Sequence, residues 1–140
     1  MATITTEMRI AALAKFLACD ADELSPASYD EKILEYGSQE YLVLTDAEAD
    51  DQAEAYIADS LWAFNASFLA SETELPEECF TALCEKCENG NDPIRRIVDK
   101  TCGLKSFVDS AVSADGRGHF LSQYDGEENE QGEFFIYRCN

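Results

Sequence analysis

Three cysteines, Cys79, Cys84 and Cys87, follow a C-x4-C-x2-C spacing, and Cys102 lies further along the chain. Thiolates at this spacing can hold an iron–sulfur cluster or a zinc ion. The segment PEECFTALCEKCEN is instead typical of a helix, on which Cys79 points away from Cys84, and the negative charge of the chain disfavours thiolates. A redox C-x-x-C pair is disfavoured as well, because these cysteines lie near the C-terminus of that helix. We therefore expect structural thiols and no metal ion or other cofactor, with metal binding by the four cysteines as the alternative.

His119 is the only histidine of the chain. Acid–base catalysis would need Asp115, Asp125 or Glu127 within reach of the imidazole, and nucleophilic catalysis would need Ser122 or a cysteine beside it. A histidine at the start of a strand is more often structural. We therefore expect no catalytic residue and no enzyme, and a small enzyme built on His119 or on a metal ion is the alternative.

A dense acidic loop, Asp125-Gly126-Glu127-Glu128-Asn129-Glu130, follows His119. Several carboxylates close together suit a hard cation such as Ca²⁺. The order of the residues does not match an EF-hand, and Asp-Gly is a common turn dipeptide. These features favour a solvated loop over a cation site.

The charge of the whole chain is the strongest compositional signal, with 29 Asp and Glu against 10 Lys and Arg and a formal net charge of −19. The chain is nevertheless 46% hydrophobic, which indicates a folded protein with a core. Direct binding to nucleic acid or to an anionic membrane is disfavoured, because both need Lys and Arg. Solubility, cation binding and docking to a basic protein surface are the remaining uses of this charge.

The charge is unevenly distributed along the chain. The net charge is −11 over residues 1–60, −5 over residues 61–90, +1 over residues 91–118 and −4 over residues 119–140. The acidity is therefore concentrated in the first two-thirds and in the final loop, and residues 92–117 form a nearly neutral region.

Apolar periodicity predicts the secondary structure of the first half. We expect a helix over residues 5–20, capped by Thr5 or Thr6, and then a short polar segment or helix over residues 28–36. Residues 40–45, EYLVLT, form a nearly continuous apolar run, which predicts a central strand buried on both faces.

A capping box at Thr45-Asp46-Ala47-Glu48 predicts a long helix that continues to about Leu69. Further helices are expected after Pro76 and from Asp92, and Gly103 bends or splits the last of them. The chain then closes with strands at residues 119–123 and 133–139, joined by the acidic loop.

These elements predict an α+β fold in which about four helices pack on a small antiparallel sheet of about three strands, with a C-terminal β-hairpin. Without a repeat or a linker, residues 1–140 are expected to form a single acidic domain. No segment has the apolar length of a membrane span, and no signal peptide is recognisable, so we expect a cytoplasmic protein with cytosolic thiols.

The sequence DGRGHFLSQYDGEENE at residues 115–130, with FFIYR at 134–138 and Asn140, resembles the C-terminal signature of a group of small acidic proteins. These proteins are encoded by bacteriophages, prophages and other mobile elements. The stretch around residues 85–92 and the EYLVLT segment with the start of the following helix are similar too, so the resemblance covers about residues 40–140. It implies a phage or mobile-element setting and carries over no catalytic or binding residue.

Small, strongly acidic phage proteins are often inhibitors of host defence, and some imitate the charge pattern of DNA. We therefore expect a non-enzymatic inhibitor, of the anti-CRISPR or anti-restriction type, that binds a basic nucleic-acid-handling host protein. It is expected to be a monomer or a small homo-oligomer. The nearly neutral region at residues 92–117 is an alternative binding surface, and acidity that serves only solubility is an alternative explanation of the charge. The carboxylates expected to bind the partner are Asp46, Asp50, Asp51, Glu54, Asp59, Glu72, Glu74, Glu77, Glu78, Glu127, Glu128 and Glu130.

Overall fold

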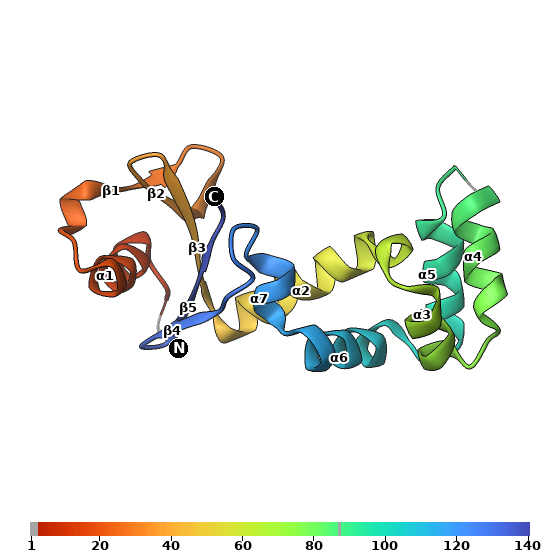
Figure 1. Ribbon diagram of the computed structural model, residues 1–140. Coiled ribbons are helices and arrows are strands. Elements are labelled where there is room, and N and C mark those ends of the chain that lie inside the picture. Colours follow the sequence, from red (N-terminus) through yellow and green to blue (C-terminus); the bar gives the residue numbers. More distant parts are fainter. Residues whose placement is uncertain (1–2, 87) are drawn as a thin grey trace. The chain divides into compact units, whose positions relative to one another are not determined.

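The computed structural model describes residues 3–86 and 88–140, so Cys87 of the cysteine motif lies outside the described residues. Contacts group the chain into two compact units, Met1–Gln52 with Asp115–Asn140, here called the sheet unit, and Ala53–Ala114, here called the helical unit (Figure 1). The α+β class is confirmed. The expected numbers of elements are wrong, because the described residues form seven α-helices and five strands.

The sheet unit contains one antiparallel sheet, in which β3 is the central strand and β5 pairs with it. Tyr41, Leu42, Val43 and Leu44 of β3 are all buried, which confirms a strand covered on both faces. The expectation of a polar segment or helix at residues 28–36 is wrong, since β2 pairs with strands on both sides, which satisfies its backbone polar groups. In spatial order the strands are β1 (Leu24–Ala27), β2 (Asp30–Tyr36), β3 (Gln39–Thr45), β5 (Phe134–Arg138) and β4 (Asn129–Gln131).

The two helices that lie wholly within the sheet unit are α1 (Thr6–Leu17) and α7 (Arg117–Leu121). The hydroxyl of Thr5 accepts a hydrogen bond from the N–H of Met8 at 3.2 Å, which confirms the predicted cap of α1. The prediction of a strand at residues 119–123 is wrong because α7 occupies most of this stretch. The C-terminal hairpin is present, but β4 and β5 form it, and the acidic loop precedes it.

Helix α2 (Asp46–Asp59) begins at the predicted capping box. The N–H of Thr45 donates to the Glu48 carboxylate at 2.9 Å, and the N–H of Glu48 donates to the Thr45 hydroxyl at 3.3 Å. Gly103, with a φ of +85°, separates two later helices, which confirms the predicted interruption. The other helical elements are η2 (Leu61–Ala63), α3 (Ala66–Thr73), α4 (Glu77–Lys86), α5 (Asn91–Lys100) and α6 (Leu104–Asp115).

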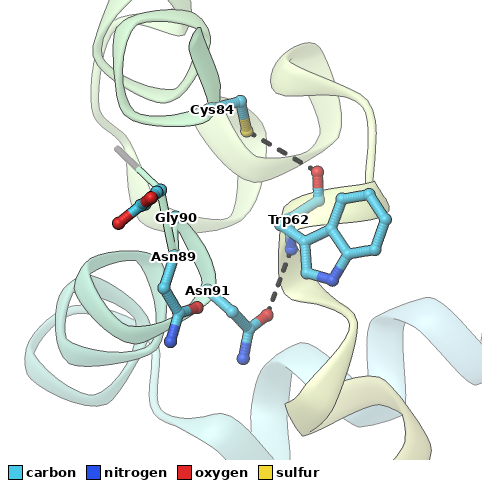
Figure 2. A pocket seen from close by; sticks show the side chains of 6 residues that line it. Trp62, Cys84, Asn89, Gly90 and Asn91 are labelled. Carbon is cyan, nitrogen blue, oxygen red and sulfur yellow. Dashed lines mark hydrogen bonds between the residues drawn. The ribbon is translucent and has the colours of Figure 1, made fainter. Parts of the chain in front are cut away.

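The predicted continuation of α2 to Leu69 is wrong, and the side chain of Asn91 explains the interruption. A continuing helix would join the N–H of Trp62 to the carbonyl of Ala58. Instead, the Asn91 amide accepts from the Trp62 N–H at 3.2 Å and donates to the Ala58 carbonyl at 2.8 Å. Figure 2 shows the bond between Asn91 and Trp62. A residue about 30 positions away in the chain thus replaces one helical hydrogen bond with two of its own.

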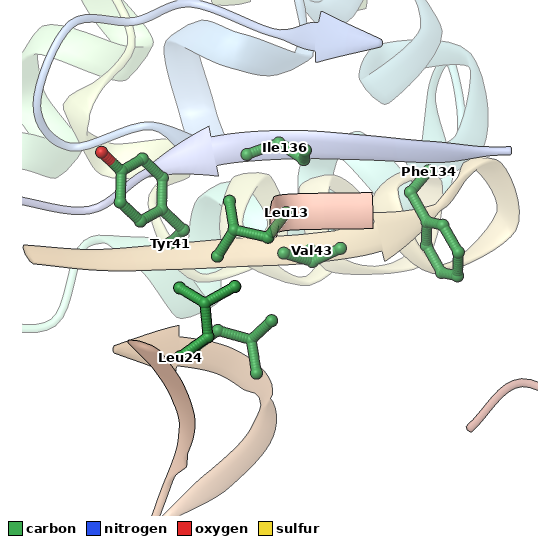
Figure 3. Packing of buried hydrophobic residues seen from close by; sticks show 7 residues of the cluster. Leu13, Leu24, Tyr41, Val43, Phe134 and Ile136 are labelled. Carbon is green, nitrogen blue, oxygen red and sulfur yellow. The ribbon is translucent and has the colours of Figure 1, made fainter. Parts of the chain in front are cut away.

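The two units have separate cores. In the sheet unit, Leu13 of α1 packs with Val43 and Ile136 on one face of the sheet (Figure 3). In the helical unit, the Phe64 and Phe107 rings meet edge to face with centroids 5.1 Å apart. The other members of the sheet-unit cluster are Leu24, Leu34, Tyr41 and Phe134.

Candidate functional site

Arg117 lies at the centre of a carboxylate cluster in the sheet unit. Its Nη1 donates to the carboxylates of Asp46 and Asp50, each at 2.9 Å, and its Nε donates to Glu128 at 2.8 Å. Its guanidinium also lies 4.7 Å from the centre of the Phe135 ring, and only 10% of its side chain is exposed. Three of the twelve carboxylates predicted to bind a partner therefore share their charge with an internal cation.

The two donors of this cluster, Arg117 and Tyr137, hold their protons tightly. Burial opposes the charged form of Arg117, but its hydrogen bonds to Glu128, Asp46 and Asp50 outweigh this and raise the pKa of Arg117. Burial and a hydrogen bond to Glu128 likewise raise the pKa of Tyr137, whose hydroxyl donates to that carboxylate. Arg117 and Tyr137 therefore act as hydrogen-bond donors that join α7 and β5 to the carboxylates around them.

A second internal ion pair joins α1 to the start of α2. The guanidinium of Arg9 binds the two carboxylate oxygens of Glu48 at 2.7 and 2.8 Å and donates to the Val43 carbonyl at 2.8 Å. Arg9 is only 4% exposed. Its hydrogen bonds lower the pKa of Glu48 from 4.5 to about 2. Glu48 therefore caps α2 and neutralises a buried cation at the same time.

Other polar residues of the C-terminal segment, residues 115–140, also make internal contacts. Ser122 Oγ lies 2.8 Å from both the Asp125 carboxylate and the Arg138 carbonyl, and it donates its single proton to one of them. The Glu127 N–H and then Ser122 lower the pKa of Asp125 by hydrogen bonding. The Arg138 guanidinium stacks 3.7 Å from the centre of the Tyr124 ring. These side chains therefore contribute to the fold of the sheet unit.

Gly118 lies at a close contact between α7 and the acidic loop. A Cβ atom at Gly118 would lie 2.5 Å from the carbonyl oxygen of Gly126 and 2.8 Å from the carbonyl carbon of Glu127. Both atoms belong to the backbone, which cannot give way as a flexible side chain would. The absence of a side chain thus allows α7 and the acidic loop to pack backbone to backbone.

His119 is exposed. Within the described residues its ring contact is with the adjacent Phe120, at 5.0 Å between centroids, and its imidazole has no hydrogen bond or ion pair there. Ser122, the predicted nucleophile partner, is buried and bonded to Asp125 or Arg138. The structure therefore does not bring the proposed catalytic residues together.

Two cysteines of the C-x4-C-x2-C spacing, Cys79 and Cys84, lie on α4. Cys79 and Cys84 are exposed free thiols, and Cys102 is a half-buried one. In the part of the chain that the structure describes, no group of three or more His, Cys, Asp or Glu side chains is placed to hold a metal ion. The contribution of Cys87 lies outside the described residues.

The outer side of α2 carries carboxylates of a different kind. Asp51, Glu54 and Asp59 are exposed, and none of them pairs with a Lys or Arg among residues 3–86 and 88–140. Asp46 and Asp50, four residues apart on one flank, bind Arg117 instead. One helix thus has an internally paired end and an outward-facing acidic face.

The remaining predicted carboxylates lie in two places. In the helical unit, Glu74, Glu77 and Glu78 are exposed where α3 ends and α4 begins, and Glu72 is half-buried there. In the sheet unit, Glu127 and Glu130 are exposed and, within the described ranges, have no ion pair. Glu77 and Glu78 also stabilise the first turn of α4 through its dipole.

Sequence reasoning missed the two structural arginines. Arg9 lies in the apolar stripe of α1, and Arg117 lies between two glycines of the signature. In a chain with only 10 Lys and Arg, a cation within an apolar stripe is a signal for a buried ion pair. Glu128 is 11 residues from Arg117, and the other partners of these arginines are 34 to 71 residues away in the chain, so the sequence did not identify them.

No protein-family model, no curated protein and no solved structure matches the chain. Within the described residues, no helix has the length and apolar character needed to cross a membrane. The function must therefore be inferred from the residues themselves.

Proposed function

We propose that this protein is a non-enzymatic inhibitor that binds a basic, nucleic-acid-handling host protein through exposed carboxylates. Anti-restriction or anti-CRISPR action in the cytoplasm of a host cell is the concrete form of this proposal. The observation that carries it is the set of outward-facing carboxylates on α2 and at the α3–α4 corner that have no cation partner among the described residues. Such groups are free to bind the Lys and Arg of a partner.

The spacing along α2 supports docking to a phosphate-binding surface. With a rise of about 1.5 Å per residue, Asp51, Glu54 and Asp59 follow one another at axial steps of about 4.5 and 7.5 Å. One strand of B-DNA carries a phosphate about every 3.4 Å along the axis. The outer face of α2 therefore has about half the axial charge density of one strand, and the corner at Glu74, Glu77 and Glu78 must supply further charge.

The proposal is tested by reversing these charges in groups. One variant carries Lys at Asp51, Glu54 and Asp59, and a second carries Lys at Glu74, Glu77 and Glu78. The matched control carries Lys at three exposed carboxylates outside the proposed set, namely Asp22, Glu31 and Asp99.

The readout is phage plating on a host with an active restriction or CRISPR system, with and without the protein. The wild-type chain and the control should restore plating, and the two test variants should not. Binding of the inhibited defence protein should weaken steeply between about 50 and 200 mM salt. Equal inhibition by all three variants would show that the acidity serves only solubility or that binding uses another surface.

A further inference from the structure

The helical unit exposes the single tryptophan of the chain. Trp62, in η2, is 58% exposed. An indole ring is a large apolar group, and tryptophans of this kind are enriched among residues that dominate protein–protein binding. The exposed indole therefore marks a candidate contact surface.

A pocket of about 260 Å³ adjoins this residue. It is smaller than a typical site for a drug-sized molecule and can hold one side chain of a partner. Its lining residues are Trp62, Cys84, Glu88, Asn89, Gly90 and Asn91.

Hydrogen bonds to both backbone polar groups of Trp62 hold this residue in place. Its N–H donates to Asn91, and its carbonyl accepts from the thiol of Cys84 at 3.6 Å (Figure 2). In the figure, the backbone of Trp62 faces these two residues and the indole ring extends beyond them. The ring is thus presented from a fixed backbone, which reduces the entropy lost on binding.

The acidic side chains around the pocket favour a cation. Glu88 lines the pocket, and Asp92 lies beside it as the acceptor of a 3.2 Å hydrogen bond from Asn89. The last turn of α4 and the first turn of α5 meet there, so the opposite partial charges of the two helix ends offset each other. Lys86 is a cation in that last turn, and Glu85, Glu88 and Asp92 outnumber it. Anionic ligands are disfavoured at such a site, whereas the face of an indole attracts Lys and Arg.

We propose that the Trp62 pocket binds a basic segment of a protein partner, with one Lys or Arg side chain on the indole face and a neighbouring cation at Glu88. The class of partner rests on the proposed function, since a basic nucleic-acid-handling protein supplies such segments. The pocket itself is a separate surface from the acidic faces of α2 and the α3–α4 corner, and it adds an aromatic anchor to charge attraction.

Tryptophan fluorescence directly tests the binding of a basic segment at the Trp62 pocket, because Trp62 is the only tryptophan of the chain. The probe is a capped peptide of alternating Arg and Gly, and its neutral counterpart carries citrulline in place of Arg. The Arg peptide should change the emission of Trp62 saturably, and the citrulline peptide should not. No change with the Arg peptide, or equal changes with both peptides, would overturn the inference.

Substitutions measure the contact at Glu88 and the contact at the Trp62 indole separately. Glu88→Gln should weaken binding of the Arg peptide about two- to fivefold, as for other exposed ion pairs. Glu7→Gln, the same change at an exposed residue of α1, should leave it unchanged. By calorimetry, Trp62→Leu should also weaken binding about two- to fivefold, whereas Trp62→Phe should retain most of it because an aromatic face remains. Equal binding by the Leu and Phe variants would contradict the aromatic contact.

Two results distinguish a wrong assignment of the pocket from a wrong proposed function. If calorimetry detects binding of the Arg peptide while Trp62 emission and the Glu88→Gln affinity stay unchanged, the pocket is not the site, and the acidic faces are. If the peptide binds at Trp62 but the charge-reversed variants inhibit host defence normally, the proposed function is wrong, and the pocket is nevertheless a cation site.

Discussion

The sheet unit and the helical unit use their carboxylates in opposite ways. The sheet unit holds 18 Asp and Glu against 5 Lys and Arg, a net charge of −13, and the helical unit holds 11 against 5, a net charge of −6. Of the six ion pairs among the described residues, five lie in the sheet unit. The sixth, between Lys105 and Asp109, is an exposed pair in the helical unit.

The net charge of a region therefore does not measure the charge available for binding. In the sheet unit, Arg9 binds the carboxylate of Glu48, Arg117 binds three carboxylates, and both arginines connect segments distant in the sequence. In the helical unit, carboxylates and cations alike face solvent, where isolated charges contribute little to stability. Substitutions of the paired carboxylates should therefore destabilise the sheet unit, and substitutions of carboxylates in the helical unit should change stability little.

The largest effect is expected at Glu48. Glu48→Gln keeps a capping group for α2 but leaves the buried Arg9 without a counter-charge, so we expect a loss of about 3 kcal/mol in the free energy of unfolding at neutral pH. Denaturant titration measures this loss. Glu31→Gln, at an exposed carboxylate of β2, is the control and should change stability by less than about 0.5 kcal/mol.

The same variant predicts a pH dependence. The pKa of Glu48 falls from 4.5 to about 2 in the folded protein, so its contribution is complete above pH 4.5 and is lost as the pH falls to about 2. The stability difference between the wild type and Glu48→Gln should shrink across this window. A constant difference down to pH 2 would contradict the assigned ion pair.

Arg117→Ala should cost about 2 to 3 kcal/mol, because it removes three charge-assisted contacts and the packing on Phe135. Its cost is smaller than that of Glu48→Gln, since the freed Asp46 and Asp50 are exposed to water. Arg95→Ala, at an exposed cation of α5, is the counterpart in the helical unit and should change stability by less than about 0.5 kcal/mol. Equal costs for the two variants would remove the distinction between the units.

Gly118→Ala should cost about 1 to 3 kcal/mol, because the new Cβ would overlap backbone atoms of the acidic loop. Gly90→Ala in the helical unit is the matched change. Its Cβ would lie 3.2 Å from the Leu83 carbonyl, a contact that a small shift relieves. Thermal unfolding of both variants should rank Gly118→Ala as the less stable, and the reverse order would contradict the close packing of α7.

The smallest expected effect is the difference in stability between double variants at the two ends of α2. Asp46→Asn with Asp50→Asn should cost about 1 kcal/mol, because both carboxylates are bound to Arg117. Glu54→Gln with Asp59→Asn should change stability by less than about 0.5 kcal/mol. Chemical denaturation of the two double variants compares the ends at equal charge change, and equal losses would show that the Arg117 pairs contribute nothing.

Several features of the secondary structure could be predicted because they depend on interactions between neighbouring residues. The cap at Thr5, the capping box of α2, the buried central strand β3 and the break at Gly103 all depend on residues within a few positions of one another. Helix capping, strand burial and glycine conformations are properties of short segments, which explains why the sequence identified them.

The errors occurred where distant residues decide the local structure. Residues 28–36 form a strand because β1 and β3 pair with them, and α2 ends at Asp59 because Asn91 takes the backbone groups that would continue it. Residues 117–121 are helical with Gly118 packed on the backbone of the acidic loop. Apolar periodicity does not record these contacts, so propensity alone gave the wrong element.

Composition and neighbouring residues are sufficient to predict the large negative charge, the α+β class and the local signals of caps and turns. The pairing of the carboxylates with cations depends on the tertiary structure. Asp50 and Asp51 are adjacent, chemically equal and both exposed, yet Asp50 binds Arg117, 67 residues away, and Asp51 has no cation partner among the described residues. Charge is a property of the residue, whereas its availability depends on which distant side chains the fold brings beside it.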